Sequence, residues 1–358
     1  MVDTHRFHSL KLGFNEVVLD SAIGHLRRLV IDGIAPLHTA PWVSDAPIDP
    51  ASETPPTEQA LSGDFFCAPF CVSDVEDAPL HGWTANAQWS LERSDDASAT
   101  YGLSRKVMGA RVAKTLAFRD GHPFLYVTHA FDGGSGRIPV SHHAMIRAAT
   151  TVRLSFSPKA LFFTPGGTPE PDPSRGSSLL KYPAEGTNLG SIPLAAGGSA
   201  DIRTYPFAEG HEDIIAFSET PGHALGWSAA VADDHIVLLL KDARVLPQTM
   251  LWMSNGGRYF PPWSSRHTRV LGIEDGCSFG PNGHRASIEP NRLNERGVPT
   301  AIDLAANPRV HYAIGAIPRP SGWSEVSAVT TTAAGLTLND VGGTTLGVPF
   351  DAGWLLRA

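Results

Sequence analysis

The chain has 358 residues, of which 42% are hydrophobic and 18% are charged. This is the composition of a globular protein with ample apolar material for a large core, and it excludes disorder along the whole chain. The length fits two average domains or one large β-sandwich or β-barrel.

The charge balance argues against nucleic acid as a partner. The chain carries 36 Asp and Glu against 28 Lys and Arg, a net charge of −8, and no run of Lys or Arg could neutralise a phosphate backbone. Residues 1–20 hold no apolar run of signal-peptide length, and no segment approaches about 18 uninterrupted apolar residues. We therefore expect a cytoplasmic protein that binds neither nucleic acid nor membranes. The oligomeric state stays open.

The three cysteines, Cys67, Cys71 and Cys277, are too few and too scattered for a disulfide framework. The spacing C-x3-C without further Cys or His is a poor zinc motif, so we predict reduced and mostly buried thiols. The chain has no HExxH motif, no Gly-x-Ser-x-Gly elbow and no phosphate-binding P-loop. We predict no metal and no cofactor.

The 29 prolines and 35 glycines are spread along the chain and favour many short strands over long helices. Residues 14–40 predict strands around a turn at Gly24, and residues 41–60 predict a surface loop. A strand begins near Trp89, and pairs of strands follow over ATYGLSRK, ARVAKTLAFRDGHPFLYVTHAF and IPVSHHAMIRAATTVRLSFS. Within the second run, Asp120-Gly121 predicts a hairpin turn.

Residues 164–200 are dense in Gly, Pro and Ser and predict a long loop or a set of weakly packed turns. Strands resume around a turn at residues 232–234 and again in PTAIDLAANPRVHYAIGAIP. The last segment has turns at Asn339-Asp340 and Gly342-Gly343. We predict an antiparallel all-β domain over residues 1–320, and over residues 321–358 a C-terminal β extension packed on that domain.

The stretch Leu251–Phe279 carries the strongest indication of a site. Its loop contains Arg258, Trp263 and His267, and an apolar strand then leads to Glu274. A partly desolvated carboxylate has a raised pKa that suits a general base, and an imidazole across a pocket suits the complementary acid. The alternative for Glu274 is a solvated strand end.

Two groups of histidines also stand out. His81 precedes Gly82, which permits close approach of a ligand to the backbone, and Trp83 offers an apolar face for stacking. The alternative there is a hairpin corner with a packed Trp. In His142-His143, adjacent side chains of a strand point to opposite faces, so only one of the two can face a common pocket.

Five motifs in order carry a family resemblance: GDFFCAPF, HGWTANAQW, VSHHAMI, LGIEDGCSF and PTAIDL…HYAIGAI. This series resembles the aldose 1-epimerase (galactose mutarotase-like) superfamily and spans roughly Phe14 to Pro318. The resemblance implies a β-supersandwich with a carbohydrate site. The two family histidines would fall on His81 and His143, and the family glutamate on Glu274.

The resemblance also implies a mechanism. Glu274 would take the proton of the anomeric hydroxyl while His143 protonates the ring oxygen, and the opened sugar would reclose as the other anomer. His81 would hold the ring oxygen or a neighbouring hydroxyl. We expect further substrate contacts from Trp83, Asn86, Asp213, Arg258, Trp263 and His267.

The substrate is less clearly indicated than the fold. Arg258 and His267 would suit an anionic substituent on the sugar, or would simply pair with surface acids. The phosphosugar branch of the superfamily often has arginine where this chain has Thr84, so its phosphate recognition is not carried over. The main hypothesis is a mutarotase-like epimerase of an aldose or of an acidic or phosphorylated sugar. The alternatives are a non-catalytic carbohydrate-binding or sensing protein, and another carbohydrate chemistry on the same fold.

Overall fold

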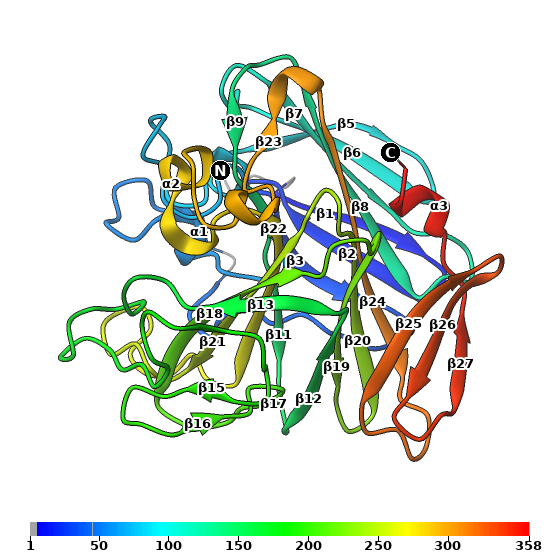
Figure 1. Ribbon diagram of the computed structural model, residues 1–358. Coiled ribbons are helices and arrows are strands. Elements are labelled where there is room, and N and C mark those ends of the chain that lie inside the picture. The colour runs from blue at the N-terminus through cyan, green and yellow to red at the C-terminus, as the bar shows by residue number, and fades with distance from the viewer. Residues whose placement is uncertain (1–5, 45, 358) are drawn as a thin grey trace.

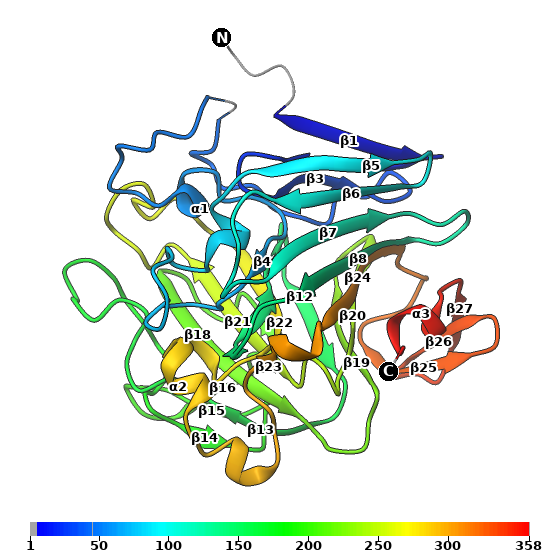
Figure 2. The same ribbon diagram turned by 90° about the horizontal axis from the view of Figure 1, so that it is seen from above.

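Two large antiparallel sheets packed against each other make up most of the protein (Figures 1 and 2). The computed structural model describes residues 6–44 and 46–357. The larger sheet has nine strands. In spatial order they are β17 (Thr204–Tyr205), β12 (Val152–Phe156), β19 (Leu225–Val231), β20 (His235–Asp242), β24 (Arg309–Pro318), β8 (Phe124–Asp132), β7 (Arg111–Ala117), β6 (Ser98–Leu103) and β5 (Trp89–Ser94).

The second sheet has eight strands. Its order is β14 (Glu185–Gly186), β13 (Lys159–Phe163), β18 (His211–Glu219), β21 (Gln248–Asn255), β22 (Val270–Cys277), β10 (Val140–His142) and β4 (Phe66–Cys67), with β11 (Ala144–Arg147) also paired to β22. Strands β21 and β22 are buried along their whole length because the other sheet covers one face and loops cover the other.

Small sheets and short helices complete the structure. The sheets are β1 (Phe7–Leu12) with β2 (Asn15–Asp20) and β3 (His25–Val30), β15 (Ile192–Pro193) with β16 (Ser199–Ala200), β9 (Arg137–Ile138) with β23 (Ile302–Asp303), and β25 (Val326–Thr332) with β26 (Gly335–Asp340) and β27 (Thr345–Val348). The α-helices are α1 (Pro56–Gln59), α2 (His284–Ile288) and α3 (Ala352–Leu355). The 3₁₀ turns are η1 (Trp83–Ala85), η2 (Gly280–Asn282), η3 (Asn294–Arg296) and η4 (Leu304–Ala306).

The antiparallel all-β architecture predicted from the sequence is confirmed. The predicted hairpins at residues 119–121 and 232–234 join β7 to β8 and β19 to β20. Two loops contain more structure than the sequence predicts: α1 lies within residues 41–60, and three two-residue strands lie within residues 164–200. No helix in residues 6–44 or 46–357 is long and apolar enough to cross a membrane.

Apolar side chains form three clusters that follow the layers. The largest fills the space between the two sheets. A second lies between the nine-stranded sheet and the sheet β25–β27, which Figure 1 shows at the side of the molecule; there Phe350 stacks on Tyr126 with ring centroids 5.3 Å apart. A third covers the outer face of the eight-stranded sheet beneath loops. The candidate site described below opens into this third cluster.

Charged side chains of alternating sign also run between the two large sheets. The series is Asp64, His142, Asp275, Lys241, Glu219 and Lys159. Lys241 on β20 reaches across the layer, with its Nζ 2.7 Å from Asp275 Oδ1 and 3.0 Å from Glu219 Oε1. Buried charges are tolerated where each is paired and hydrogen-bonded, and this series holds the two sheets in one relative position.

We predict that Lys241→Met destabilises the protein by about 3–5 kcal/mol, because removing one partner leaves buried carboxylates without compensation. The free energy of unfolding in urea measures the change. The matched control is Lys11→Met: Lys11 is 66% exposed and pairs with Glu16 at 3.1 Å. For such a surface pair we expect a change below about 1 kcal/mol. Equal changes in the two variants would contradict a structural role for the buried series.

Candidate functional site

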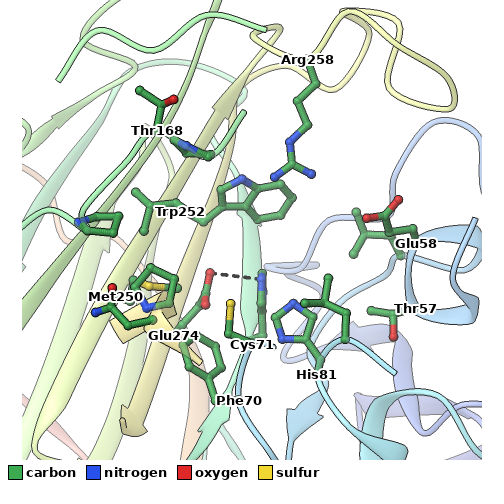
Figure 3. A pocket seen from close by; sticks show the side chains of 18 of the residues that line it. Thr57, Glu58, Phe70, Cys71, His81, Thr168, Met250, Trp252, Arg258 and Glu274 are labelled. Carbon is green, nitrogen blue, oxygen red and sulfur yellow. Dashed lines mark ion pairs between the residues drawn. The ribbon is translucent and has the colours of Figure 1, made fainter. Parts of the chain in front are cut away.

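A cavity of about 500 Å³ opens on the outer face of the eight-stranded sheet (Figure 3). Strands supply its floor: Glu274 comes from β22, and Met250 and Trp252 come from β21. Loops supply its walls, namely residues 57–61, 65–71, 80–81, 165–169, 258–263 and 281–282. This volume lies within the range of small-molecule sites in proteins.

The pairing of β10 and β11 with β22 places His143 and Glu274 together in this cavity. Ala144 pairs with Ile273 on one side of these two residues, and Ser141 pairs with Gly276 on the other. Counting inward from both pairs, His143 lies opposite Glu274 and His142 lies opposite Asp275. Because neighbouring side chains of a strand alternate between faces, His143 and Glu274 face the cavity while His142 and Asp275 face the other sheet.

Glu274 and His143 are in direct contact. Glu274 Oε1 lies 3.1 Å from His143 Nε2, the interaction drawn as a dashed line in Figure 3. Burial raises the pKa of Glu274 well above its ordinary value. Burial lowers the pKa of His143 well below its ordinary value, and the nearby His81 lowers it further. Burial therefore favours the uncharged form of both groups, in which the pair holds one proton, on Glu274.

Each member of this pair keeps an unused polar atom. Glu274 Oε2 and His143 Nδ1 are buried and have no hydrogen-bond partner among the described residues. The His143 ring is held by aromatic neighbours: it stacks on Phe65 with centroids 4.5 Å apart and meets Trp252 edge-on at 5.4 Å. A buried polar atom without a partner is costly, so its occurrence beside a cavity indicates a place for a ligand group.

Gly272 makes room for the pair. It lies two residues before Glu274 on the same face of β22 and pairs with Trp252 of β21. A Cβ at this position would lie 3.1 Å from both Glu274 Oε1 and His143 Cε1 and 3.2 Å from the Trp252 Cβ. A side chain at position 272 would therefore crowd Glu274, His143 and Trp252 and force them to shift.

His81 lies beside the pair, with its ring 5.9 Å from that of His143 and at 89° to it. Its backbone is in the left-handed region (φ 67°), which is unusual for a residue other than glycine and is often found at functional sites. Burial and the charge of Arg258 lower the pKa of His81 to about 4, so the ring is neutral at pH 7. Its buried Nδ1 has no partner among the described residues.

Gly82 has a different role from the one predicted. The sequence predicts a close approach of a ligand to this glycine. In the structure the Ala68 backbone occupies that place, since a Cβ on Gly82 would lie 2.0 Å from Ala68 O. Gly82 therefore fixes the loop that carries His81 against the start of the sheet.

Arg258 enters the cavity from the side opposite Phe70, above the Trp252 ring in Figure 3. Its Nε lies 3.0 Å from Glu212 Oε1, and its guanidinium carbon is 4.4 Å from the Trp263 ring centroid. Glu58 lines the same side of the cavity, and burial raises its pKa. The positive charge of Arg258 is therefore already paired with Glu212, and Glu58 lies on the same side.

The structure brings five of the predicted site residues to the cavity: Glu274, His143, His81, Arg258 and Trp263. The other four predicted substrate-binding residues are not among those that line it. Trp83 is half-buried and packs under the Arg105 guanidinium at 4.9 Å. His267 stacks on Trp252 at 5.3 Å, behind the cavity wall.

Asn86 and Asp213 have their polar atoms occupied by the protein. Asn86 Oδ1 accepts hydrogen bonds from Thr57 N at 3.0 Å and Thr57 Oγ1 at 2.6 Å, so it holds the segment that carries Thr57 and Glu58. Asp213 accepts hydrogen bonds from the Leu179 and Leu180 backbone and, at 2.9 Å, from Tyr182 OH. The contacts of Asn86 order a wall of the cavity, those of Asp213 hold residues 179–182, and neither side chain is left available to a sugar.

Several cavity residues escape prediction from the sequence. Trp252 lies in an apolar run that predicts only core, although its register opposite Gly272 puts it in the wall. Glu58, in the short helix α1, and Thr168, in a loop, both lie in Pro-rich segments, where nothing local indicates that the chain folds back over the sheet. Within residues 6–44 and 46–357, no group of three or more His, Cys, Asp or Glu is placed to hold a metal ion.

Solved structures provide a match where sequences do not. No protein-family model and no curated protein matches the chain. An Escherichia coli K12 protein described as a candidate aldose 1-epimerase superposes with a TM-score of 0.60 at 11% identity, covering 87% of this chain and 99% of its own. A galactose mutarotase-like protein from Lactobacillus casei gives 0.54 at 11% identity, covering 87% and 100%. An aldose epimerase homologue from C. elegans gives 0.51 at 12%, covering 88% and 99%.

These likenesses show the fold. The chain has the galactose mutarotase-like β-sandwich fold, which confirms the fold implied by the ordered motifs of the sequence. At such identities the likeness does not extend to activity or substrate, and the chemistry must be argued from the cavity itself.

We predict that Glu274→Gln raises the free energy of unfolding, and by more at pH 8 than at pH 5. The raised pKa of Glu274 means that the folded state holds its proton more tightly than the unfolded chain does. Wild-type stability therefore falls as pH rises from the unfolded pKa toward the folded one, whereas the amide needs no proton. Urea unfolding across this pH range measures the difference.

The matched control is Glu53→Gln, in an exposed loop, for which we expect a small change at both pH values. A gain at Glu274 that is the same at both pH values would contradict the raised pKa.

Proposed function

We propose that this protein interconverts the anomers of an aldose by general acid–base catalysis with Glu274 and His143. The observation that carries the proposal is the contact between these two groups at 3.1 Å on the floor of a cavity that a monosaccharide fits. The structural neighbours described as aldose 1-epimerase and galactose mutarotase-like proteins support the same reaction class.

The reaction needs an acid and a base that lie next to each other. The anomeric oxygen and the ring oxygen are bonded to the same carbon, so one pair of adjacent groups can serve both. Glu274, as carboxylate, takes the proton of the anomeric hydroxyl, and the C1–O1 bond becomes a carbonyl. The bond from C1 to the ring oxygen breaks, and that oxygen takes a proton from His143 Nε2. Rotation about C1–C2 and reversal of the steps yields the other anomer.

The number of protons that Glu274 and His143 hold together suits this reaction cycle. The reactive form needs a Glu274 carboxylate and a His143 imidazolium, which together hold one proton. The neutral pair favoured by burial holds the same single proton on Glu274. Transfer along the existing hydrogen bond converts one form into the other, so no exchange with solvent is needed between turnovers.

A neutral sugar fits the cavity better than an acidic or phosphorylated one. The Arg258 guanidinium already has Glu212 at 3.0 Å, and the carboxyl group of Glu58 lies on the same side of the cavity. His81 is neutral because burial lowers its pKa to about 4. Among the described residues that line the cavity, no cation without a carboxylate partner is left to meet an anionic substituent, whereas Arg258, Glu58 and His81 can each bond a hydroxyl.

One observation favours the alternative, a carbohydrate-binding or sensing protein without turnover. Glu274 and His143 already bond each other without a substrate. A protein that only binds sugar could therefore keep this contact unchanged. Such a protein would bind sugars saturably in the cavity and leave the rate of anomer exchange unchanged.

We predict that the protein accelerates anomer exchange of a neutral aldose, and that Glu274→Gln and His143→Gln each lower the rate by at least about 100-fold, the usual effect of removing a general acid or base. Saturation-transfer NMR on a panel of hexoses, pentoses and their 6-phosphates measures the rate. The neutral sugars should be the better substrates.

The matched control is His235→Gln, at the first residue of β20, whose ring is bonded to the exposed Asp234; this variant should leave the rate unchanged. Exchange that survives in both Glu274→Gln and His143→Gln would overturn the residue assignment. Saturable binding without exchange for every sugar on the panel would establish the binding-protein alternative.

We further predict that the rate of exchange has no acidic limb near pH 6.5, the ordinary pKa of histidine. An acidic limb there would arise if His143 took up a second proton for the pair, and burial lowers the pKa of His143 well below its ordinary value. A pH–rate profile from pH 5.5 to 7.5 tests this. A rate that falls as the pH drops through 6.5 would show instead that His143 titrates as an isolated, solvated imidazole.

A further inference from the structure

A second hollow, of about 880 Å³, lies behind the wall of the sugar cavity and is here called the arginine groove. His267 stands between the two, because its ring packs on Trp252 of the cavity at 5.3 Å and lies 5.1 Å from His38, which lines the groove. The groove and the cavity share no lining residue. It is therefore a separate site.

Four arginines from three parts of the chain line the arginine groove: Arg27, Arg28, Arg147 and Arg266. A β-bulge explains the first two. Val18 pairs with Arg28 and Leu19 with Leu26, which leaves Arg27 as an extra residue in β3. A bulge re-aims side chains, so two consecutive arginines can border one groove instead of pointing to opposite faces.

The other two arginines arrive through backbone pairing and a loop. The segment containing His38 pairs with β11, since Leu37 bridges Ile146 and His38 N donates to Met145 O at 2.9 Å. This pairing sets Arg147, the last residue of β11, beside the groove floor. Arg266 follows Trp263 in the loop that also forms the cavity wall.

Two of the four arginines of the groove lack a carboxylate partner in the part of the chain that the structure describes. No Asp or Glu occurs among its lining residues, and among the described residues no ion pair engages Arg147 or Arg266. Arg28 is 62% exposed, and its Nη1 is 3.7 Å from Glu16 Oε2, too long for a strong pair. His38 Nε2 is buried without a partner in the described structure. In a chain of net charge −8, this concentration of cations stands out.

We propose that the arginine groove binds a small polyanion through Arg28, Arg147 and Arg266. Guanidinium groups present forked N–H donors that match the oxygens of phosphate and carboxylate groups. The three arginines stand around a hollow larger than a single anion, so the ligand carries at least two anionic groups. Thr39 and Thr268 add hydroxyls to the lining and suit the polar body of such a ligand. This proposal does not depend on the reaction proposed for the cavity.

The test is isothermal titration calorimetry of the full chain with inorganic pyrophosphate and, separately, with citrate, at low and at physiological salt. We expect saturable binding of at least one probe that weakens as salt rises. Tighter binding of pyrophosphate would assign a phosphorylated ligand, and tighter binding of citrate a polycarboxylate. Arg147→Gln and Arg266→Gln should each weaken binding about tenfold, the loss expected for one charge-assisted contact.

Two further variants locate the anion. Arg93→Gln, at an exposed arginine of β5, is the matched control and should bind as the wild type does. Binding that is lost in Arg258→Gln but kept in Arg147→Gln and Arg266→Gln would place the anion in the sugar cavity and overturn the proposal. No saturable binding of either probe at low salt would also overturn it. Thermal unfolding of each variant separates lost binding from lost fold.

Discussion

The site depends on one step of a β-ladder, where His142-His143 of the β10–β11 segment lies opposite Glu274-Asp275 of β22. The alternation of side chains sends one His–acid pair to the cavity and the adjacent His–acid pair into the layer between the sheets. The cavity pair carries the proposed chemistry. The inner pair belongs to the buried series of charges that reaches Lys241 on the other sheet, so it anchors the strand that presents Glu274.

The two pairs use the same kinds of residue and reach opposite protonation states. For His142, burial alone would lower the pKa, but hydrogen bonds and charges from Asp275 and Asp64 outweigh it and raise the pKa to about 9. For Asp275, Lys241 and His142 outweigh burial and lower its pKa. Glu274 has no such cation, so burial alone raises its pKa. The neighbouring charges therefore make His142 and Asp275 a fixed ion pair. Glu274 and His143, without such neighbours, form a pair that can exchange one proton.

The sequence predicts the parts of this arrangement that depend on local pattern. Alternating apolar runs and turn residues predict the antiparallel strands, and the order of short motifs points to His81, His143 and Glu274, all of which line the cavity. Prediction from the sequence fails where tertiary packing decides which residues reach the cavity. Asp213 resembles a ligand-binding carboxylate in sequence, yet backbone N–H groups and Tyr182 occupy it. Glu58 and Trp252 reach the cavity only through loop folding and strand register, which no local pattern records.

The register of β22 also fixes which residues face the cavity. A slip of one residue in β22 would send Asp275 to the cavity and Glu274 into the charged layer, because the side-chain period of a strand is two. The slip would part Asp275 from Lys241 and His142, now 2.7 and 3.5 Å away, and would bring Ile273 and Gly276 to the wrong faces. The buried ion pairs therefore oppose every register except the one that aligns Glu274 with His143. The charged layer therefore specifies where Glu274 and His143 come together, independently of its contribution to the free energy of unfolding.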